Sequence, residues 1–183
     1  ISYFGDGACE EGVLHESLNL ASVMNLPTVF ICENNLFSSH LRIDQRQPDL
    51  YTSRFALAHK IESKVLDGNN ITELYKFMKN QFISVRKSHK PIFIEAFTYR
   101  WKGHVGFRED EDVGVKRSQD LSKWRHRDPI LLLANELIKE NKLSKEELKK
   151  MENDILDKID SDWDKALNAK FPDKSNLKNF VYS

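Results

Sequence analysis

The sequence predicts an α/β fold in which a mostly parallel sheet is flanked by helices and followed by a helical C-terminal extension. Strand-like and helix-like patterns alternate along residues 1–99, as a parallel sheet with crossover helices requires. The continuous apolar run at residues 28–32 is typical of a strand covered on both faces, and residues 92–97 are expected to form another buried strand. Beyond residue 128 the apolar spacing is that of helices alone.

Seven elements are expected in the first part of the chain. In order, they are a buried strand at 1–4, a helix at 10–25, a strand at 28–32, a helix at 49–59, a strand at 64–66, a helix at 71–87 and a strand at 92–97. Turn residues bound the strands: Gly5 ends the first, Asp67 and Gly68 close the third, and Pro27 and Pro91 precede the second and fourth. The helices carry apolar residues at spacings of three and four, which place them on one face.

The rest of the chain divides into a loop and an extension. Residues 100–128 are charged and contain three glycines, and they are longer than a simple connection requires. We therefore expect either a functional loop or a disordered one, and we expect it to be mobile without ligand. Residues 129–183 are expected to form a helical extension of the same domain. Its second helix begins with a capping box, in which Ser144 precedes Glu147 by three residues.

Composition excludes some classes of function. Lys plus Arg and Asp plus Glu both number 28, so the net charge of zero argues against bulk electrostatic binding to nucleic acid or to an anionic membrane. No apolar run approaches the ~20 residues of a membrane span, and no signal peptide is apparent, so a cytoplasmic location is expected. Cys9 and Cys32 lack CxxC spacing, which favours buried thiols over a zinc site. Because the chain opens on Ile1 inside a strand-like run, we expect that a preceding segment belongs to the protein.

Two polar motifs follow the first two predicted strands. Gly5-Asp6-Gly7 follows the first, and after 26 further residues Asn34-Asn35 follows the second. Ligands of open parallel sheets bind at the carboxyl ends of the strands, so both motifs can face one ligand. The glycines allow a phosphate to approach the backbone, and a helix expected to begin near Ala8 directs N–H groups to the same place. Asp6 and Asn35 offer hard oxygens, which Mg²⁺ prefers.

Each motif alone is a common turn or loop, and only their joint placement, one helix apart, indicates a shared site. The glycine spacing is not that of a dinucleotide-binding fingerprint, and no Gly-Lys-Ser/Thr follows that would indicate a P-loop.

The Gly-Asp-Gly and Asn-Asn motifs at this spacing resemble the thiamine diphosphate signature. The fuller string GDGACEEGVLHESLNLASVMNLPTVFICENN resembles specifically the alpha subunits of pyruvate, branched-chain 2-oxo acid and acetoin dehydrogenases. The resemblance continues through residues 67–68, 98–104 and 127–130, and covers about residues 1–170. It implies a thiamine diphosphate-binding fold, with residues 1–99 as the diphosphate- and magnesium-binding core and residues 100–128 as an active-site loop that orders around the cofactor.

The resemblance also implies roles for individual residues. The side chains of Asp6 and Asn35 and the backbone carbonyl of Phe37 correspond to magnesium ligands. The backbones of Gly7 and Ala8 correspond to positions that contact the diphosphate. The position of His104 matches a loop histidine near the diphosphate and the reaction centre, which makes it both the candidate catalytic residue and a cofactor-binding residue.

Three positions depart from the family pattern. Ser39, followed by His40, stands where relatives place the large aliphatic residue that bends the cofactor, so Leu36 or Leu41 must do this or the chemistry differs. Val13 replaces an acidic residue found in some relatives. Val105 replaces the serine that mitochondrial relatives phosphorylate, so that regulation is not expected.

The resemblance implies an oligomeric, heterotetrameric enzyme that decarboxylates a 2-oxo acid or cleaves an acyloin. A beta-type subunit would supply the glutamate that activates the aminopyrimidine ring, so this chain alone is expected to be catalytically incomplete. A lipoyl-bearing acyltransferase is an expected acyl acceptor. Two alternatives stay open at this point: a transketolase-like or sugar-modifying thiamine diphosphate enzyme, and a truncated, non-catalytic scaffold.

Overall fold

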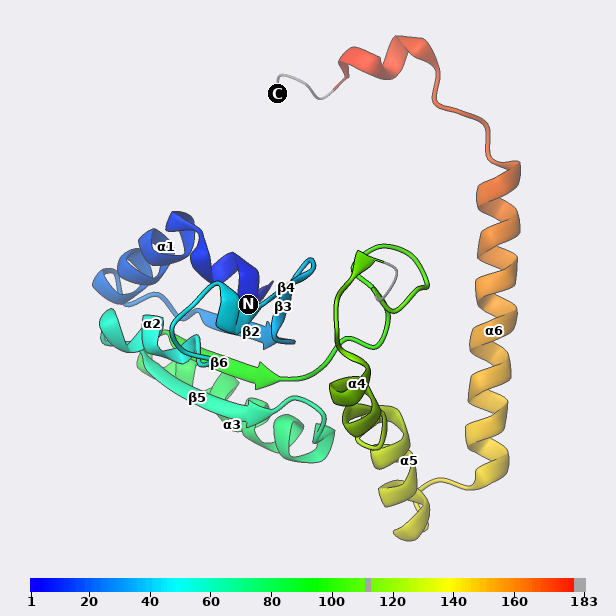
Figure 1. The fold of residues 1–183 in the computed structure, drawn as a ribbon, viewed down its shortest axis with the longest axis horizontal. Coiled ribbons are helices and arrows are strands. Elements are labelled where there is room, and N and C mark those ends of the chain that lie inside the picture. The colour runs from blue at the N-terminus through cyan, green and yellow to red at the C-terminus, as the bar shows by residue number, and fades with distance from the viewer. Residues whose placement is uncertain (111–112, 180–183) are drawn as a thin grey trace. The chain divides into compact units, whose positions relative to one another are not determined.

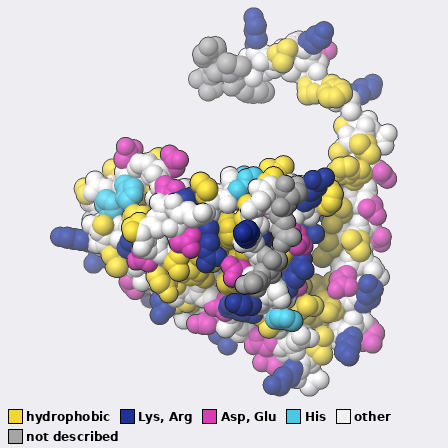
Figure 2. Space-filling view, in the orientation of Figure 1, with side chains coloured by type: hydrophobic (Ala, Val, Ile, Leu, Met, Phe, Trp, Pro, Cys, Tyr) yellow, Lys and Arg dark blue, Asp and Glu magenta, His cyan; other side chains and the backbone are white. Residues whose placement is uncertain are grey.

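The computed structural model describes residues 1–110 and 113–179. The chain forms two compact units, Ile1–Leu133 and Ala134–Ser183, and each is described by itself. The expected fold class is confirmed, since a parallel sheet is flanked by helices and the C-terminal part is helical (Figure 1). Figure 2 shows basic and acidic side chains interspersed over the face in view, in keeping with the zero net charge.

A sheet of four parallel strands forms the centre of the first unit. In spatial order the strands are β1 (Ser2–Gly5), β2 (Val29–Asn34), β6 (Ile92–Phe97) and β5 (Glu62–Asp67). β2 and β6 lie in the middle and are largely buried, as expected for both strands. The register pairs Gly5 with Glu33, so β1 and β2 end side by side.

Helices cover both faces of this sheet. α1 (Gly12–Val23) and α2 (Ser53–Ala58) lie on one face, and α3 (Ile71–Ser88) lies on the other (Figure 1). Successive side chains of a strand point to opposite faces, so Phe30 and Cys32 pack with Leu18 of α1, whereas Ile31 packs with Val85 of α3. The two central strands are thereby covered on both faces, whereas the outer strands β1 and β5 stay partly exposed.

Two details at the start of the chain differ from expectation. The first strand was expected to be buried, but Tyr3 is 64% exposed because β1 is the edge strand of the sheet in the described part of the chain. The helix expected to begin near Ala8 begins at Gly12, and residues 6–10 form a 3₁₀ turn, η1 (Asp6–Glu10). The 3₁₀ turn is therefore the element that carries Gly7 and Ala8.

Several short elements were not predicted. β3 (Phe37–Ser38) and β4 (Leu41–Arg42) form an antiparallel hairpin directly after Asn35, and the 3₁₀ turn η2 (Ile43–Gln45) follows it. Within the expected active-site loop at residues 100–128, the helix α4 (Ser118–Arg125) was also not predicted. Residues 111–112 of that expected loop lie outside the described residues.

A third core cluster lies beyond the carboxyl ends of the strands. It joins the β3–β4 hairpin to α4 through buried apolar side chains, namely Leu36, Phe37, Ile43, Tyr99 and Leu121. Because apolar burial is what orders such a segment, these contacts explain how a charged stretch gains a fixed fold. The hairpin and the second half of the expected loop are thus packed against each other.

The second unit is helical. The division between the units falls inside α5 (Pro129–Lys139), and α6 (Lys145–Asn168) and the 3₁₀ turn η4 (Lys174–Lys178) follow. The predicted capping box of α6 is confirmed: the Ser144 hydroxyl accepts from the backbone N–H of Glu147, whose carboxylate accepts from the Ser144 backbone. In the part of the chain that the structure describes, no helix combines the length and apolar character needed to cross a membrane.

Candidate functional site

Asp6, which directly follows β1, is the most buried charged group at the carboxyl edge of the sheet beside β2. Its side chain is 1% exposed, and its Oδ2 atom accepts a hydrogen bond and ion pair from Nη2 of Arg46. Its Oδ1 atom is buried and has no hydrogen-bond partner in the described part of the chain. A buried carboxylate oxygen without a donor is costly, so this atom is open to a cation or to an ordered water molecule.

The electrostatics of Asp6 reflect this environment. Burial raises the pKa of Asp6 above 3.8, while the Arg46 hydrogen bond and charge, and the backbone amides of Asp6 and Asn35, oppose that rise. The influence of the Asn35 backbone means that the two strand ends are in electrostatic contact, as neighbouring parallel strands about 4.8 Å apart require.

Asn35 lies at the start of a tight turn into the hairpin. Its Oδ1 atom accepts from the backbone N–H of Phe37 at 3.0 Å, an Asx turn, and the intervening Leu36 has a φ of +69°. Asn35 is half-buried and Phe37 is buried. The structure therefore brings Asp6, Asn35 and Phe37 to one corner of the sheet, with one lone pair of the Asn35 oxygen already engaged.

Asn34, the other half of the motif, has a structural role. Its Nδ2 donates to Oε1 of Glu95 at 2.7 Å and to the carbonyl of Leu50 at 2.9 Å. Glu95 is fully buried and also accepts from the backbone N–H groups of Thr52 and Ser53, both at 2.9 Å. Asn34 thus anchors the start of α2 to the sheet and is not available as a ligand.

Gly7 and Ala8 lie in η1, next to Asp6. A Cβ atom added at Gly7 would lie 2.7 Å from Cβ of Ser38 and closer still to its hydroxyl. The absence of a side chain at Gly7 is therefore required by packing against the hairpin, a reason that the sequence did not reveal. Ala8 is exposed.

Two thiols lie behind this turn. Cys9 and Cys32 are buried and unbonded, with their sulfur atoms 3.8 Å apart, so the expected buried thiols are confirmed. The hydrogen bond with Cys9, together with burial, raises the pKa of Cys32. The Cys32 thiol therefore stays protonated, and the two buried thiols act as packing groups.

His104 lies in a different cluster, formed by the loop and the hairpin. It is exposed, its Nδ1 atom is 3.5 Å from Nη1 of Arg100, and its ring lies 6.4 Å from that of His40 in a T-shaped arrangement. The hairpin that begins after Asn35 thus connects His104 to the Asp6 corner.

Asp110 organises the cluster around His104, and sequence reasoning missed it. Its carboxylate accepts from the backbone N–H of His104 at 3.1 Å and forms ion pairs with Arg100 at 2.7 Å and Arg117 at 3.2 Å. A Cβ atom at Gly103 would collide with this carboxylate, so the glycine permits the close approach. In the sequence, Asp110 was one acid among many in a charged stretch.

An open cleft of about 720 Å³ lies beside the hairpin. Its walls include Phe37, His40, Leu41, Arg42, Gly114 and Lys116. Of the two residues considered as the aliphatic prop, Leu36 is buried in the third core cluster, whereas Leu41 is 55% exposed and faces the cleft. Leu41 is therefore the one in a position to contact a ligand, and Ser39 instead accepts from Arg100 through its carbonyl at 3.0 Å.

The donor set fits a magnesium ion that is also bound to a diphosphate. Among the residues that the structure describes, no three His, Cys, Asp or Glu side chains gather to form a metal site by themselves. Asp6 Oδ1 is a free anionic oxygen, and Asn35 offers a neutral one. Such a partial set suits Mg²⁺, which usually takes one or two carboxylates and completes its octahedron with phosphate oxygens and water.

Comparisons with known proteins give one consistent picture. The family model described as dehydrogenase E1 component matches residues 1–175. The chain is 32% identical to the pyruvate dehydrogenase E1 component subunit alpha-3, chloroplastic, of Oryza sativa subsp. japonica, over 100% of the chain and 42% of the rice protein. It is 27% identical to the 2-oxoisovalerate dehydrogenase subunit alpha of Bacillus subtilis, over 98% of the chain and 54% of that protein. The chain thus spans about half the length of these relatives.

Proposed function

Because the chain belongs to the dehydrogenase E1 component family, we propose that it acts within an alpha-type subunit of a thiamine diphosphate-dependent 2-oxo acid dehydrogenase. The observation that carries the proposal is the buried, unpartnered Oδ1 atom of Asp6 beside Asn35, at the ends of two neighbouring parallel strands. The names of the relatives, pyruvate and 2-oxoisovalerate dehydrogenase alpha subunits, support a 2-oxo acid as the substrate class.

The corner residues would hold the magnesium diphosphate. Asp6 and Asn35 would ligate Mg²⁺ through side-chain oxygens, and Phe37 through its backbone carbonyl. Gly7 and Ala8 would approach the diphosphate through the backbone of η1. Thiamine diphosphate, when bound, supplies the carbon nucleophile and the electron sink for decarboxylation. The contribution of this chain is to neutralise and fix the charged end of that group.

His104 would act at the substrate end of the site. Because its Nδ1 atom faces Arg100, a proton would be exchanged with substrate at Nε2. The ion pairs of Asp110 with Arg100 and Arg117 hold the main chain of the histidine in place. This arrangement allows the side chain of His104 to reach a ligand while its backbone stays fixed.

The remaining groups must come from partners. We assign no residue of this chain to activation of the aminopyrimidine ring, so the proposal includes a beta-type subunit that supplies a glutamate. It also includes a lipoyl-bearing acyltransferase as the acyl acceptor. In the family, acyl transfer follows decarboxylation, so both partners would act on the same active site.

Replacing the proposed metal ligand tests the function. In the full-length protein assembled with its beta-type partner, Asp6→Ala is expected to abolish Mg²⁺-dependent binding of thiamine diphosphate in isothermal titration calorimetry, and decarboxylation of 2-oxo acids with it. Asp49→Ala is the matched control, since Asp49 is exposed and only caps the backbone of Tyr51 at 3.1 Å. Wild-type affinity in Asp6→Ala would refute the metal assignment.

A further inference from the structure

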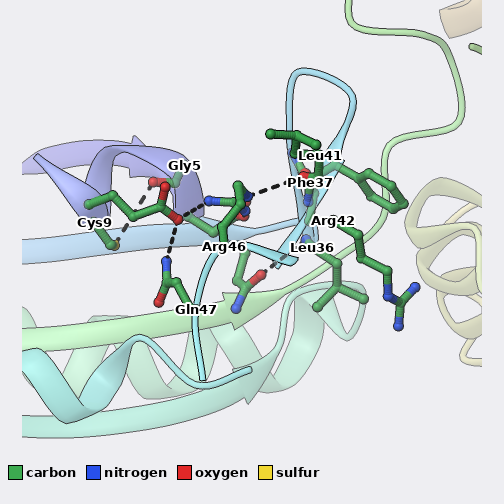
Figure 3. A network of polar contacts seen from close by, with 12 residues as sticks. Gly5, Cys9, Leu36, Phe37, Leu41, Arg42, Arg46 and Gln47 are labelled. Carbon is green, nitrogen blue, oxygen red and sulfur yellow. Dashed lines mark hydrogen bonds and ion pairs between the residues drawn. The ribbon is translucent and has the colours of Figure 1, made fainter. Parts of the chain in front are cut away.

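Arg46 is a buried cation in contact with the proposed metal ligand. Its side chain is only 6% exposed. Its two terminal nitrogens form ion pairs with Asp6 Oδ2 and Glu10 Oε1, and its Nε donates to the carbonyl of Leu41 at 3.2 Å. Figure 3 shows Arg46 between the η1 turn and the hairpin strand that carries Leu41. Arg46 thereby joins its own end of the hairpin to Asp6, a residue 40 positions earlier in the chain.

A chain of hydrogen bonds fixes this guanidinium from behind. Glu10 Oε1 also accepts from Nε2 of Gln47 at 2.7 Å, and Oε1 of Gln47 accepts from Nη2 of Arg54 at 2.7 Å. Gln47 is buried, whereas the side chain of Glu10 is 35% exposed, so the chain of contacts runs from the interior to the surface. The donors of Arg46 are thus held in one geometry, which a planar guanidinium retains well.

The charges next to Arg46 do not balance. Asp6 and Glu10 bring two negative charges, and the guanidinium between them brings one positive charge. The uncompensated negative charge can attract a cation at Asp6 Oδ1, the oxygen that lacks a donor, because Oδ2 already binds Arg46. The carboxylate therefore has one oxygen that is held and one that is open.

We propose that Arg46 is a positioning residue for Asp6: by binding Oδ2, it fixes the carboxylate with Oδ1 directed to the divalent cation. The inference rests on the proposed function, because it presupposes that Asp6 is the metal ligand. Its physical basis is that carboxylates bound to metals are held in turn by hydrogen bonds from outer groups, and loss of such a group costs about 10- to 100-fold in metal affinity.

The same contact has a competing interpretation with the opposite consequence. If the guanidinium of Arg46 occupied the cation site itself, the metal ion would have to displace it, and removing Arg46 would tighten metal binding. The free Oδ1 atom favours the positioning role, because a cation can bind there while the Arg46 contact stays intact.

The test measures the metal directly in the full-length protein assembled with its beta-type partner. Mn²⁺ replaces Mg²⁺ as the probe, and the electron paramagnetic resonance signal of free Mn²⁺ gives its dissociation constant in the presence of thiamine diphosphate. Arg46→Met is expected to weaken Mn²⁺ binding about 10- to 100-fold. Arg46→Lys keeps one donor and the charge, so its affinity is expected to lie between those of Arg46→Met and the wild type.

Arg54→Met is the matched control. It removes a guanidinium from the same chain of hydrogen bonds without touching Asp6, so its loss of Mn²⁺ affinity is expected to be clearly smaller than that of Arg46→Met. If Arg46→Met fails to fold, Arg46→Lys decides, since an unchanged affinity in that variant would overturn the proposal.

The outcomes separate the two proposals. Wild-type or tighter Mn²⁺ binding in Arg46→Met overturns the positioning role and leaves the proposed function standing. An equal loss in Arg46→Met and Arg54→Met also overturns it, because the effect would then be a general loosening of the network. Failure of the wild-type assembly to bind Mn²⁺ with thiamine diphosphate overturns the proposed function, and the positioning role with it.

Discussion

Gly7→Ala is expected to destabilise the protein through a single steric clash. The added Cβ atom would lie 2.7 Å from Cβ of Ser38, which is a distance that folded proteins avoid. Without that clash, replacing a glycine whose backbone tolerates alanine would stabilise by about 0.4–1 kcal/mol through the unfolded chain. Overpacking costs about 1–3 kcal/mol, so the net loss in the free energy of unfolding is expected to be up to about 2.5 kcal/mol.

The structure also predicts how to relieve the clash. After Cβ and Oγ of Ser38, the next atom is its Cα at 3.6 Å, an ordinary contact. Ser38→Gly removes both clashing atoms, so the double variant is expected to be more stable than Gly7→Ala. The coupling free energy in the double-mutant cycle is expected to be about 1–3 kcal/mol.

Urea denaturation of the wild type, both single variants and the double variant measures this coupling. A double variant that is no more stable than Gly7→Ala would refute the steric explanation. Titration with magnesium and thiamine diphosphate adds a second result. If the double variant regains stability but still fails to bind thiamine diphosphate, the diphosphate itself requires a residue without a side chain at position 7.

Two further predictions concern the hairpin and the third core cluster. Leu41→Ala is expected to lower the turnover rate of the assembled enzyme while changing the free energy of unfolding by less than about 0.5 kcal/mol. Leu36→Ala removes a buried side chain and should lower the free energy of unfolding by about 2–4 kcal/mol. The reverse pattern in activity assays and urea denaturation would mean that Leu36 is the aliphatic residue that contacts the cofactor. Burial raises the pKa of Tyr99 above 10.0, opposed by the charge of Arg117, so the unfolded state ionises first and stability should fall as pH rises beyond about 10. Tyr99→Phe should show less of this fall in urea denaturation from about pH 8 to 11, and an unchanged pH dependence would contradict it.

Sequence reasoning located the Asp6 corner because the signals that define it are local. Apolar runs of strand length and a helical pattern between them determine a parallel pair, and parallel strands end at the same edge. Asp6 and Asn35 could therefore be assigned to one corner without coordinates. The strand at residues 1–4 shows the limit, since its apolar character could not indicate that β1 is an edge strand in the described fold.

The sequence by itself determined the α/β class, the order of the main elements and the pair Asp6 and Asn35, because periodicity and strand-end placement are properties of neighbouring residues. Only the tertiary structure decided that Asn34 anchors α2, that Asp110 holds the loop of His104, and that Arg46 contacts Asp6. These are contacts between segments that are distant in the chain. The sequence alone does not indicate which distant residue a given charged or polar side chain will contact. Such contacts depend on how hairpin, loop and sheet pack together, and the burial of the third core cluster contributes to that packing between hairpin and loop.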